Sequence, residues 1–201
     1  MDIKSPPYGL LLVVSGPAGV GKTTVCERPI AEEANLRRAI TATTRPPREG
    51  ERDGVDYHFL DKATFEAKIA EDAFHEHAEV HGQFYGTLKS EVNDTLAAGT
   101  DLLLNIDVQG ASTFRENAPA DERLRDHLVT VFITPPTLEV LEERLRGRGT
   151  DDEEEIQRRL RVAVREIENC DQYDYCLRSG ARWEDFENLR AIYRAEKMRV
   201  R

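Results

Sequence analysis

A glycine-rich segment near the start of the chain has the residue types and spacing of a loop that binds phosphate. It fits the pattern G-x-x-x-x-G-K-[ST] and consists of Gly16, Pro17, Ala18, Gly19, Val20, Gly21, Lys22 and Thr23. Glycines let the backbone turn several N–H groups toward one anion, and a helix that starts there adds the positive end of its dipole. We expect this loop, with Thr24, to bind ATP, with Lys22 as a catalytic residue on the β- and γ-phosphates and Thr23 as a ligand of Mg²⁺. The alternative is a glycine turn that only joins a strand to a helix.

A second group of side chains has the chemistry to hold another phosphate. Arg45 and Arg48 flank two prolines, which stiffen their loop, and a rigid pair of guanidinium groups suits phosphate better than flexible lysines do. Tyr57 and Tyr85 can each donate a hydroxyl hydrogen to a phosphate oxygen. The alternatives are solvated loop charges for the arginines and half-buried packing residues for the tyrosines.

Glu76 has the chemistry to distinguish one base from another. A carboxylate can accept from the N1–H and the exocyclic amine of guanine together, whereas adenine presents no such pair of donors. A buried Glu76 would therefore select guanine, and the hydroxyls of Thr41 and Thr87 could add contacts to the base. A surface carboxylate is the alternative.

Asp107 follows an apolar segment and has two possible roles. An acid at the end of a buried strand beside a phosphate loop can hold the hydration shell of Mg²⁺. An Asp between a strand and a helix is also a common helix N-cap. The sequence leaves both roles open.

The elements that must position these residues follow from the hydrophobic pattern. Apolar segments predict buried strands at residues 9–15, 101–107 and 128–134, with short strands at 39–43 and 175–178. Residues 45–56 should be loop, and 74–85 an irregular stretch with strand-like pieces. Helical patterns cover 21–34, 62–71, 88–98, 137–146, a segment that starts with a capping box at 150–153, and 183–198. Alternating strands and helices predict an α/β fold, a parallel sheet with helices on both faces and ligands beyond the carboxyl ends of its strands.

The last helices allow finer expectations. Thr137 should cap the helix that follows it, and Thr150 the next one. Spacing predicts the ion pairs Glu154–Arg158 and Glu155–Arg159. The side chains expected to point inward are Ile156, Leu160, Ala163, Val164 and Ile167 in one helix and Trp183, Phe186, Leu189 and Tyr193 in the last.

Composition limits the classes of partner. The 201 residues carry a formal net charge of −10, which repels nucleic acid on average. No apolar run of about 18 residues and no secretory signal is found, so we expect no membrane partner and a cytoplasmic location. Cys26, Cys170 and Cys176 lack C-x-x-C spacing, which predicts free thiols in a reducing compartment.

The order and spacing of several segments resemble the guanylate kinase family, whose members phosphorylate GMP with ATP. Each segment alone is a weak signal, and the resemblance runs from about residue 10 to residue 160. Besides the phosphate loop it rests on TTRPPREG at 43–50, GVDYHF at 54–59, FHE at 74–76, FYGT at 84–87, IDVQG at 106–110 and RGT at 148–150.

The resemblance implies one domain over residues 1–201, with a three-layer P-loop NTPase core at about 9–40, 88–136 and 162–201. A GMP-binding subdomain would span about 41–87 and a helical lid about 137–161. The implied GMP site consists of Thr41, Arg45, Arg48, Tyr57, Glu76, Tyr85, Thr87 and Asp107. Lid arginines stand at Arg144 and Arg148, expected to bind ATP, and at Arg159; the implied catalytic residues are Lys22, Arg45, Arg148 and Arg159. The expected reaction is transfer from MgATP to GMP by a monomer or homodimer, with the use of dGMP left open.

Two positions depart from the family pattern. Asn105 stands where an acid is common, and Ser179 stands where the family often has an Asn that contacts adenine. Two other functions stay open: a guanylate-kinase-like binding module without catalysis, and a related P-loop kinase of another phosphorylated small molecule. The intact phosphate loop argues against the first, and Glu76 with the two loop arginines against the second.

Overall fold

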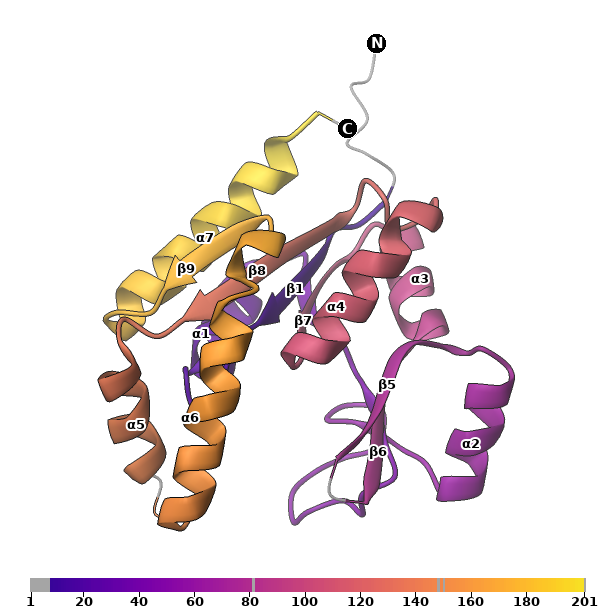
Figure 1. Ribbon diagram of the computed structural model, residues 1–201. Helices are drawn as coiled ribbons and strands as arrows, with labels where there is room; N and C mark the ends of the chain where they lie inside the picture. Colours follow the sequence, from indigo (N-terminus) through magenta and orange to yellow (C-terminus); the bar gives the residue numbers. More distant parts are fainter. Residues whose placement is uncertain (1–7, 81, 148, 150, 201) are drawn as a thin grey trace.

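The computed structural model describes residues 8–80, 82–147, 149 and 151–200, and its larger sheet is parallel throughout. The strand order is β2-β7-β1-β8-β9, and Figure 1 shows β7, β1, β8 and β9. The strands are β1 (Leu11–Ser15), β2 (Leu36–Arg38), β7 (Asp101–Asn105), β8 (Leu128–Thr134) and β9 (Tyr175–Arg178). The three apolar segments form the three central strands, as predicted, because a strand buried on both faces needs a continuous apolar run.

Alternate residues of β1 enter two separate hydrophobic cores. Leu12 and Val14 pack in a core shared with α1 (Lys22–Glu32) and α7 (Arg182–Met198). Leu11 and Val13 pack in a core shared with α3 (Lys89–Ala97) and α4 (Val108–Asn117). The α/β fold with helices on both faces of a parallel sheet is therefore confirmed.

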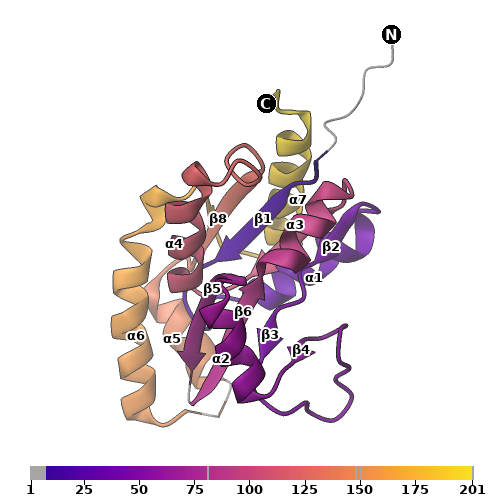
Figure 2. The ribbon, with the colours of Figure 1, turned by 90° about the vertical axis from the view of Figure 1, so that its right-hand side faces the viewer.

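A second, four-stranded sheet lies beside this core, in the order β4-β3-β6-β5 (Figure 2). It consists of β3 (Ala42–Thr43), β4 (His58–Phe59), β5 (Phe74–Val80) and β6 (Gln83–Leu88), with α2 (Lys62–Ala70) packed on it. Phe65 of α2 stacks between Phe74 and Phe84, at centroid distances of 4.4 and 5.3 Å.

Two strand predictions in this region were only partly correct. The strand-like pieces expected at 74–85 are confirmed, but the stretch is a regular antiparallel hairpin instead of an irregular one; its first strand lacks apolar alternation because it carries two histidines and two glutamates. Of the strand expected at 39–43 only residues 42–43 form a strand, β3 of the small sheet, because residues 39–41 connect it to β2, which ends at residue 38 in the large sheet.

Two helices, α5 (Leu138–Arg146) and α6 (Glu153–Ile167), pack together on the side of the molecule opposite to α2 (Figure 1). Thr137 caps α5 by accepting from the Val140 N–H at 3.3 Å, as predicted. The N-cap of α6 is Asp152, whose carboxylate accepts from the Glu155 N–H at 2.8 Å. The predicted cap, Thr150, lies outside the described residues.

The pairing and burial predictions for the last helices were partly correct. Arg159 pairs with Glu155 as predicted, but Arg158 pairs with Glu155 instead of Glu154. Val164 is 39% exposed and Trp183 is 61% exposed, so both expectations of inward packing were wrong. Residues spaced three apart do not stay on one face of a helix, because each residue advances about 100°. Trp183, ten residues before the buried Tyr193, therefore points about 80° away from it.

Candidate membrane spans are absent from the described residues, since none of their helices is both long and apolar enough to cross a bilayer.

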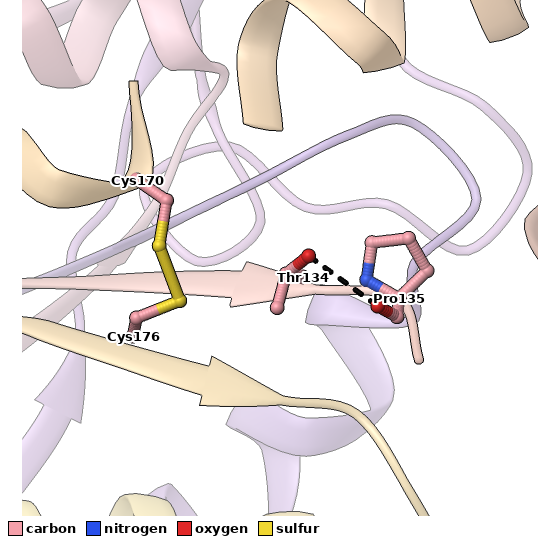
Figure 3. Close-up of a disulfide and its surroundings, with 4 residues drawn as sticks. All are labelled: Thr134, Pro135, Cys170 and Cys176. Atoms are coloured by element: carbon pink, nitrogen blue, oxygen red, sulfur yellow. Dashed lines mark hydrogen bonds between the residues drawn. A yellow bond between two sulfur atoms is a disulfide. The ribbon is translucent and has the colours of Figure 1, made fainter. Parts of the chain in front are cut away.

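The prediction of three free thiols was wrong. Cys170, in the short 3₁₀ helix η2 (Cys170–Gln172), forms a disulfide with Cys176 of β9 (Figure 3). Spacing gave no signal for this pair because the chain turns between the two residues and brings their Cα atoms to 6.2 Å. Cys26 is the remaining free thiol, and burial raises its pKa to about 12.

Reducing this disulfide should lower the melting temperature by about 5 °C, because opening a short cross-linked loop restores entropy to the unfolded chain. Scanning calorimetry with and without a dithiol would measure the shift, and Cys176 is exposed to the reagent. The control is Cys170→Ser, which should start at the lower melting temperature and not respond to the dithiol. A native thiol titration that finds three free thiols would contradict the pairing.

Candidate functional site

The phosphate loop connects β1 to α1, and two of its glycines permit close packing. Gly16 has φ of 143°, and a Cβ there would lie 2.2 Å from the carbonyl oxygen of Ile133 in β8. Gly19 has φ of 92°, and a Cβ there would lie 2.9 Å from Cδ2 of Leu145 in α5. Glycine is therefore required for the loop to lie directly against β8 and α5.

Lys22 is the first residue of α1 and folds back over the loop. Its Nζ donates to the carbonyl oxygens of Gly16 at 2.6 Å and Pro17 at 3.1 Å. A cavity of about 240 Å³ is lined by Ala18, Gly19, Gly21, Lys22, Thr23 and Thr24. A lysine and a helix N-terminus thus line one cavity, and both favour an anion there.

Of the residues expected near Mg²⁺, Thr23 lies in the first turn of α1 and Asp107 lies two residues after the end of β7. Asn105 donates through Nδ2 to the Thr23 hydroxyl at 3.3 Å. Asp107 caps α4 by accepting from the Gly110 N–H at 2.8 Å, so the capping role that the sequence left open is observed.

Hydroxyl and carboxylate oxygens are suitable donors for Mg²⁺, which commonly takes only one or two protein ligands together with nucleotide phosphates. Among the described residues no group of three or more His, Cys, Asp and Glu side chains could hold a metal by itself. Thr23 and Asp107 therefore fit an ion that arrives with a nucleotide.

A second cavity, of about 280 Å³, brings together residues that are distant in sequence. Its lining includes five of the side chains expected for the acceptor nucleotide: Thr41, Tyr57, Glu76, Tyr85 and Asp107. They come from β5, β6, the end of β7 and the loops that precede β3 and β4. The small sheet and the end of the large sheet thus build this pocket jointly.

Glu76 is the chemically distinctive residue of this pocket. The Thr87 hydroxyl donates to its Oε1 at 2.6 Å, which fixes the carboxylate. Burial first, and the nearby Asp107 charge to a smaller extent, raise the pKa of Glu76 to about 6 against the opposing effect of the Thr87 hydrogen bonds. A half-buried, oriented acceptor of two hydrogen bonds matches the guanine edge.

Arg45 is held by a residue that sequence reasoning missed. Its Nη1 and Nη2 each donate to one carboxylate oxygen of Glu51 at 2.9 Å, and the Arg48 N–H donates to Glu51 at 2.7 Å. These bonds lower the pKa of Glu51 to about 2, the Arg45 bond first. The pKa of Arg45 is raised by Glu51 and, to a smaller extent, by the Tyr85 hydroxyl, so Arg45 and Tyr85 meet at this site.

The role of Glu51 could have been inferred from its position in the sequence, because it lies six residues after Arg45 in the same loop stiffened by prolines. Arg38 was also missed; it donates to the Asp56 carbonyl oxygen at 2.9 Å and lies 5.6 Å from the Tyr57 ring centroid. Its position at the end of a short edge strand gave no chemical pattern.

The arginines of the expected lid differ in position. Arg144 of α5 donates to the Val20 carbonyl oxygen of the phosphate loop at 2.9 Å. Arg159 of α6 is bound to Glu155 at 2.8 Å and lies 3.4 Å from Asp151. Arg148, the third arginine of the expected lid, lies outside the described residues. Arg48, which was expected at the GMP site, has an exposed side chain. The structure therefore brings Arg144 to the loop but leaves Arg159 paired within its own segment.

A third cavity, of about 320 Å³, adjoins both sites. Thr41, Tyr57 and Asn105 line both this cavity and the Glu76 pocket. Thr23 lines both this cavity and the one at the phosphate loop. The two candidate nucleotide sites are therefore neighbours of the same cavity.

Another cavity, of about 760 Å³, lies between β5 and the residues that follow α4. Glu76 lines this cavity as well as the acceptor pocket, whereas none of the phosphate-loop residues lines it.

The fold and the site together define a P-loop NTPase, with a phosphate loop between the first core strand and its helix and a second pocket, lined by Glu76, nearby. The family model described as "Guanylate kinase" matches residues 8–195. The chain belongs to the guanylate kinase family.

Similar proteins agree with this family. A guanylate kinase of Carboxydothermus hydrogenoformans is 46% identical over 95% of this chain and 90% of its own length. A guanylate kinase of Sphingopyxis alaskensis is 45% identical over 96% of this chain and 85% of its own length. The crystal structure of guanylate kinase from Anaplasma phagocytophilum matches with a TM-score of 0.73 and 34% identity, over 98% of this chain and 89% of that one.

Proposed function

We propose that this chain transfers the γ-phosphoryl group of ATP to the phosphate of GMP, giving ADP and GDP. The observation that carries the proposal is the row of neighbouring cavities that leads from the phosphate loop to the Glu76 pocket, with Thr23 and Asn105 as shared lining residues. Donor and acceptor phosphates must meet for in-line transfer, and this row of cavities is where they would meet.

On the acceptor side, Glu76 would accept from guanine N1–H and the exocyclic amine, with Thr41, Thr87 and Asp107 beside the base. Arg45, Arg48, Tyr57 and Tyr85 would bind the GMP phosphate. Glu51 accepts from both Nη1 and Nη2 of Arg45, and the Pro46 carbonyl oxygen also accepts from Nη1, which orients the guanidinium group.

On the donor side, the phosphate loop and Thr24 would hold the ATP phosphates, with Lys22 on the β- and γ-phosphates and Arg144 and Arg148 as further ligands. Thr23, and Asp107 directly or through water, would hold Mg²⁺. When bound, Mg²⁺ neutralises charge on the phosphate oxygens.

In the reaction, a GMP phosphate oxygen forms a bond to the γ-phosphorus as the bond to the ADP oxygen breaks. The acceptor phosphate is largely ionised near neutral pH, so we assign no general base. Lys22, Arg45, Arg148 and Arg159 would stabilise the charge on the transferred group, and no covalent enzyme intermediate is needed.

For Arg159 this role requires movement, because it is now paired with Glu155 and Asp151. We propose that residues 137–161 form a lid that closes over ATP, that 41–87 form the GMP-binding subdomain, and that the remaining segments form the core. Closure would exclude water and could limit turnover. The small nucleotides are the proposed partners of a cytoplasmic monomer or homodimer that binds neither nucleic acid nor membrane.

The two rival functions fit the site less well. A binding module without catalysis would not need Lys22 at an intact phosphate loop. A kinase of a sugar phosphate would not need an oriented carboxylate at Glu76 in its acceptor pocket.

A coupled ATPase assay with GMP, AMP, UMP and CMP tests the acceptor. We expect kcat/KM for GMP to exceed that for AMP by at least about 10³-fold, because a base that leaves a buried acceptor unpaired is strongly rejected. Equal rates with AMP would contradict GMP as the acceptor, and absence of ATP and GMP binding in calorimetry would favour the binding module.

A further inference from the structure

Asp185 is a buried carboxylate in the first turns of α7 that the mechanism above does not use. It is only 4% exposed. Its Oδ1 accepts from the Gly180 N–H at 2.7 Å, and its Oδ2 accepts from the Ser179 hydroxyl at 3.0 Å. A buried charge needs such partners, so Asp185 has a fixed position and a fixed direction.

Ser179 connects Asp185 to Arg144 of α5. It is 2% exposed and follows β9, where its N–H donates to the Thr134 carbonyl oxygen at 2.8 Å. Because the hydroxyl has one hydrogen and gives it to Asp185, its oxygen presents lone pairs to a donor. That donor is Nη1 of Arg144, at 3.1 Å.

The same Nη1 of Arg144 reaches the phosphate loop. It donates to the Val20 carbonyl oxygen at 2.9 Å, so both hydrogens of Nη1 are engaged. Within the part of the chain that is described, Nε and Nη2 of Arg144 have no hydrogen-bond partner. The guanidinium is thus fixed by one nitrogen, with two nitrogens left for a ligand.

These contacts join three segments that meet at one corner of the molecule: the end of β9, the start of α7, and α5 (Figure 1). The phosphate loop is the fourth member, because Gly19 already packs against Leu145 of α5. A negative charge at Asp185, one hydroxyl away, also favours the cationic Arg144 in this position.

We propose that Asp185 is a positioning residue for ATP binding: acting through Ser179, it orients Arg144 at the phosphate loop. The inference rests on the proposed role of Arg144 as an ATP ligand. It assigns to Ser179 a task different from a direct contact with adenine, because its hydroxyl is committed to Asp185 and Arg144.

The test compares Asp185→Asn and Ser179→Ala with the unchanged chain, with KM for ATP, KM for GMP, kcat and melting temperature measured for each. We expect each variant to raise KM for ATP about 10-fold, the cost of roughly one charge-assisted hydrogen bond, with KM for GMP changed less than about 2-fold. The double variant should raise KM for ATP about 10-fold as well, instead of about 100-fold, because both substitutions break the same chain of contacts.

Asp174→Asn is the matched control. Asp174 also accepts from a backbone N–H and a hydroxyl, both of Thr130, at 2.7 and 2.8 Å on the same edge of the sheet. It should lower the melting temperature without changing KM for ATP. An equal rise of KM for ATP in Asp174→Asn and Asp185→Asn would show a general loss of stability and overturn the inference.

Arg144→Ala separates the inference from the proposed function. If Arg144→Ala raises KM for ATP but Asp185→Asn does not, the relay is wrong and the ATP role of Arg144 stands. If Arg144→Ala leaves KM for ATP unchanged, the role of Arg144 fails and the inference fails with it, whereas GMP kinase activity is decided by the acceptor assay.

Discussion

Lys22→Ala should lower kcat by about 10³-fold, the effect of removing one preorganised charge from a developing anionic transition state. Lys22 and the first turn of α1 line the cavity at the phosphate loop. The ammonium is preorganised there by the carbonyl oxygens of Gly16 and Pro17, at 2.6 and 3.1 Å. Removing it leaves the γ-phosphoryl oxygens without that charge, so kcat should fall more than KM for ATP rises.

Steady-state kinetics with saturating GMP measure this effect, and Lys89→Ala is the matched control. Lys89 is a partly exposed lysine at the start of α3, paired with Asp72 and outside the phosphate loop. The control should keep near-normal kcat. Turnover near that of the unchanged chain in Lys22→Ala would remove Lys22 from the catalytic residues.

The strands of the large sheet could be predicted from the sequence because each depends on the apolar residues of one short segment. Residues 10–14, 102–104 and 128–133 are short, largely apolar runs, and a strand covered on both faces can bury such a run completely. The phosphate loop was predictable for a related reason: its glycines allow conformations and close contacts that other residues cannot adopt.

The acceptor pocket was less accessible to sequence reasoning because its contacts are between distant segments. Glu76 could be expected to accept from guanine, but its fixation by Thr87 depends on the pairing of β5 with β6, which the polar sequence of β5 did not predict. The bidentate Arg45–Glu51 contact depends on a loop conformation that charge alone does not determine.

The same limit applies to the disulfide and to Ser179. Cys170 and Cys176 meet because η2 turns the chain before β9. The position of Ser179 suggested an adenine contact, but its neighbours come from α5 and α7, which are 35 and 6 residues away.

Glu76→Gln should lower kcat/KM for GMP by about 10²-fold and raise the ratio of AMP to GMP turnover. The amide keeps the size of the carboxylate but has one acceptor and one donor group. It would place N–H groups opposite one guanine donor, whereas it matches the N1 acceptor and amine donor of adenine. The coupled assay with both nucleotides measures the ratio.

Glu79→Gln is the matched control, the same change on the same strand at an exposed position. It should leave both nucleotides unaffected. Glu76→Gln with an unchanged preference for GMP would show that the carboxylate does not contact the base edge.

The pH dependence gives a second measurement on the same group. Burial raises the pKa of Glu76 to about 6 in the folded chain, above its ordinary value of 4.5. The folded state then binds this proton more tightly than the unfolded state, so unliganded stability is higher below pH 4.5 and is lost as the pH rises through about 6. Guanine needs the ionised form, so kcat/KM for GMP should fall below pH 6.

The GMP phosphate titrates in the same range, with a pKa near about 6, so the acid limb in the unchanged chain combines two groups. Glu76→Gln removes one of them and should leave a shallower limb caused by the substrate alone. It should also abolish the loss of unliganded stability between pH 4.5 and 6, because no proton is released at this position. A base-recognising carboxylate predicts both changes together, whereas a carboxylate that only packs against Thr87 predicts the stability change without the kinetic one.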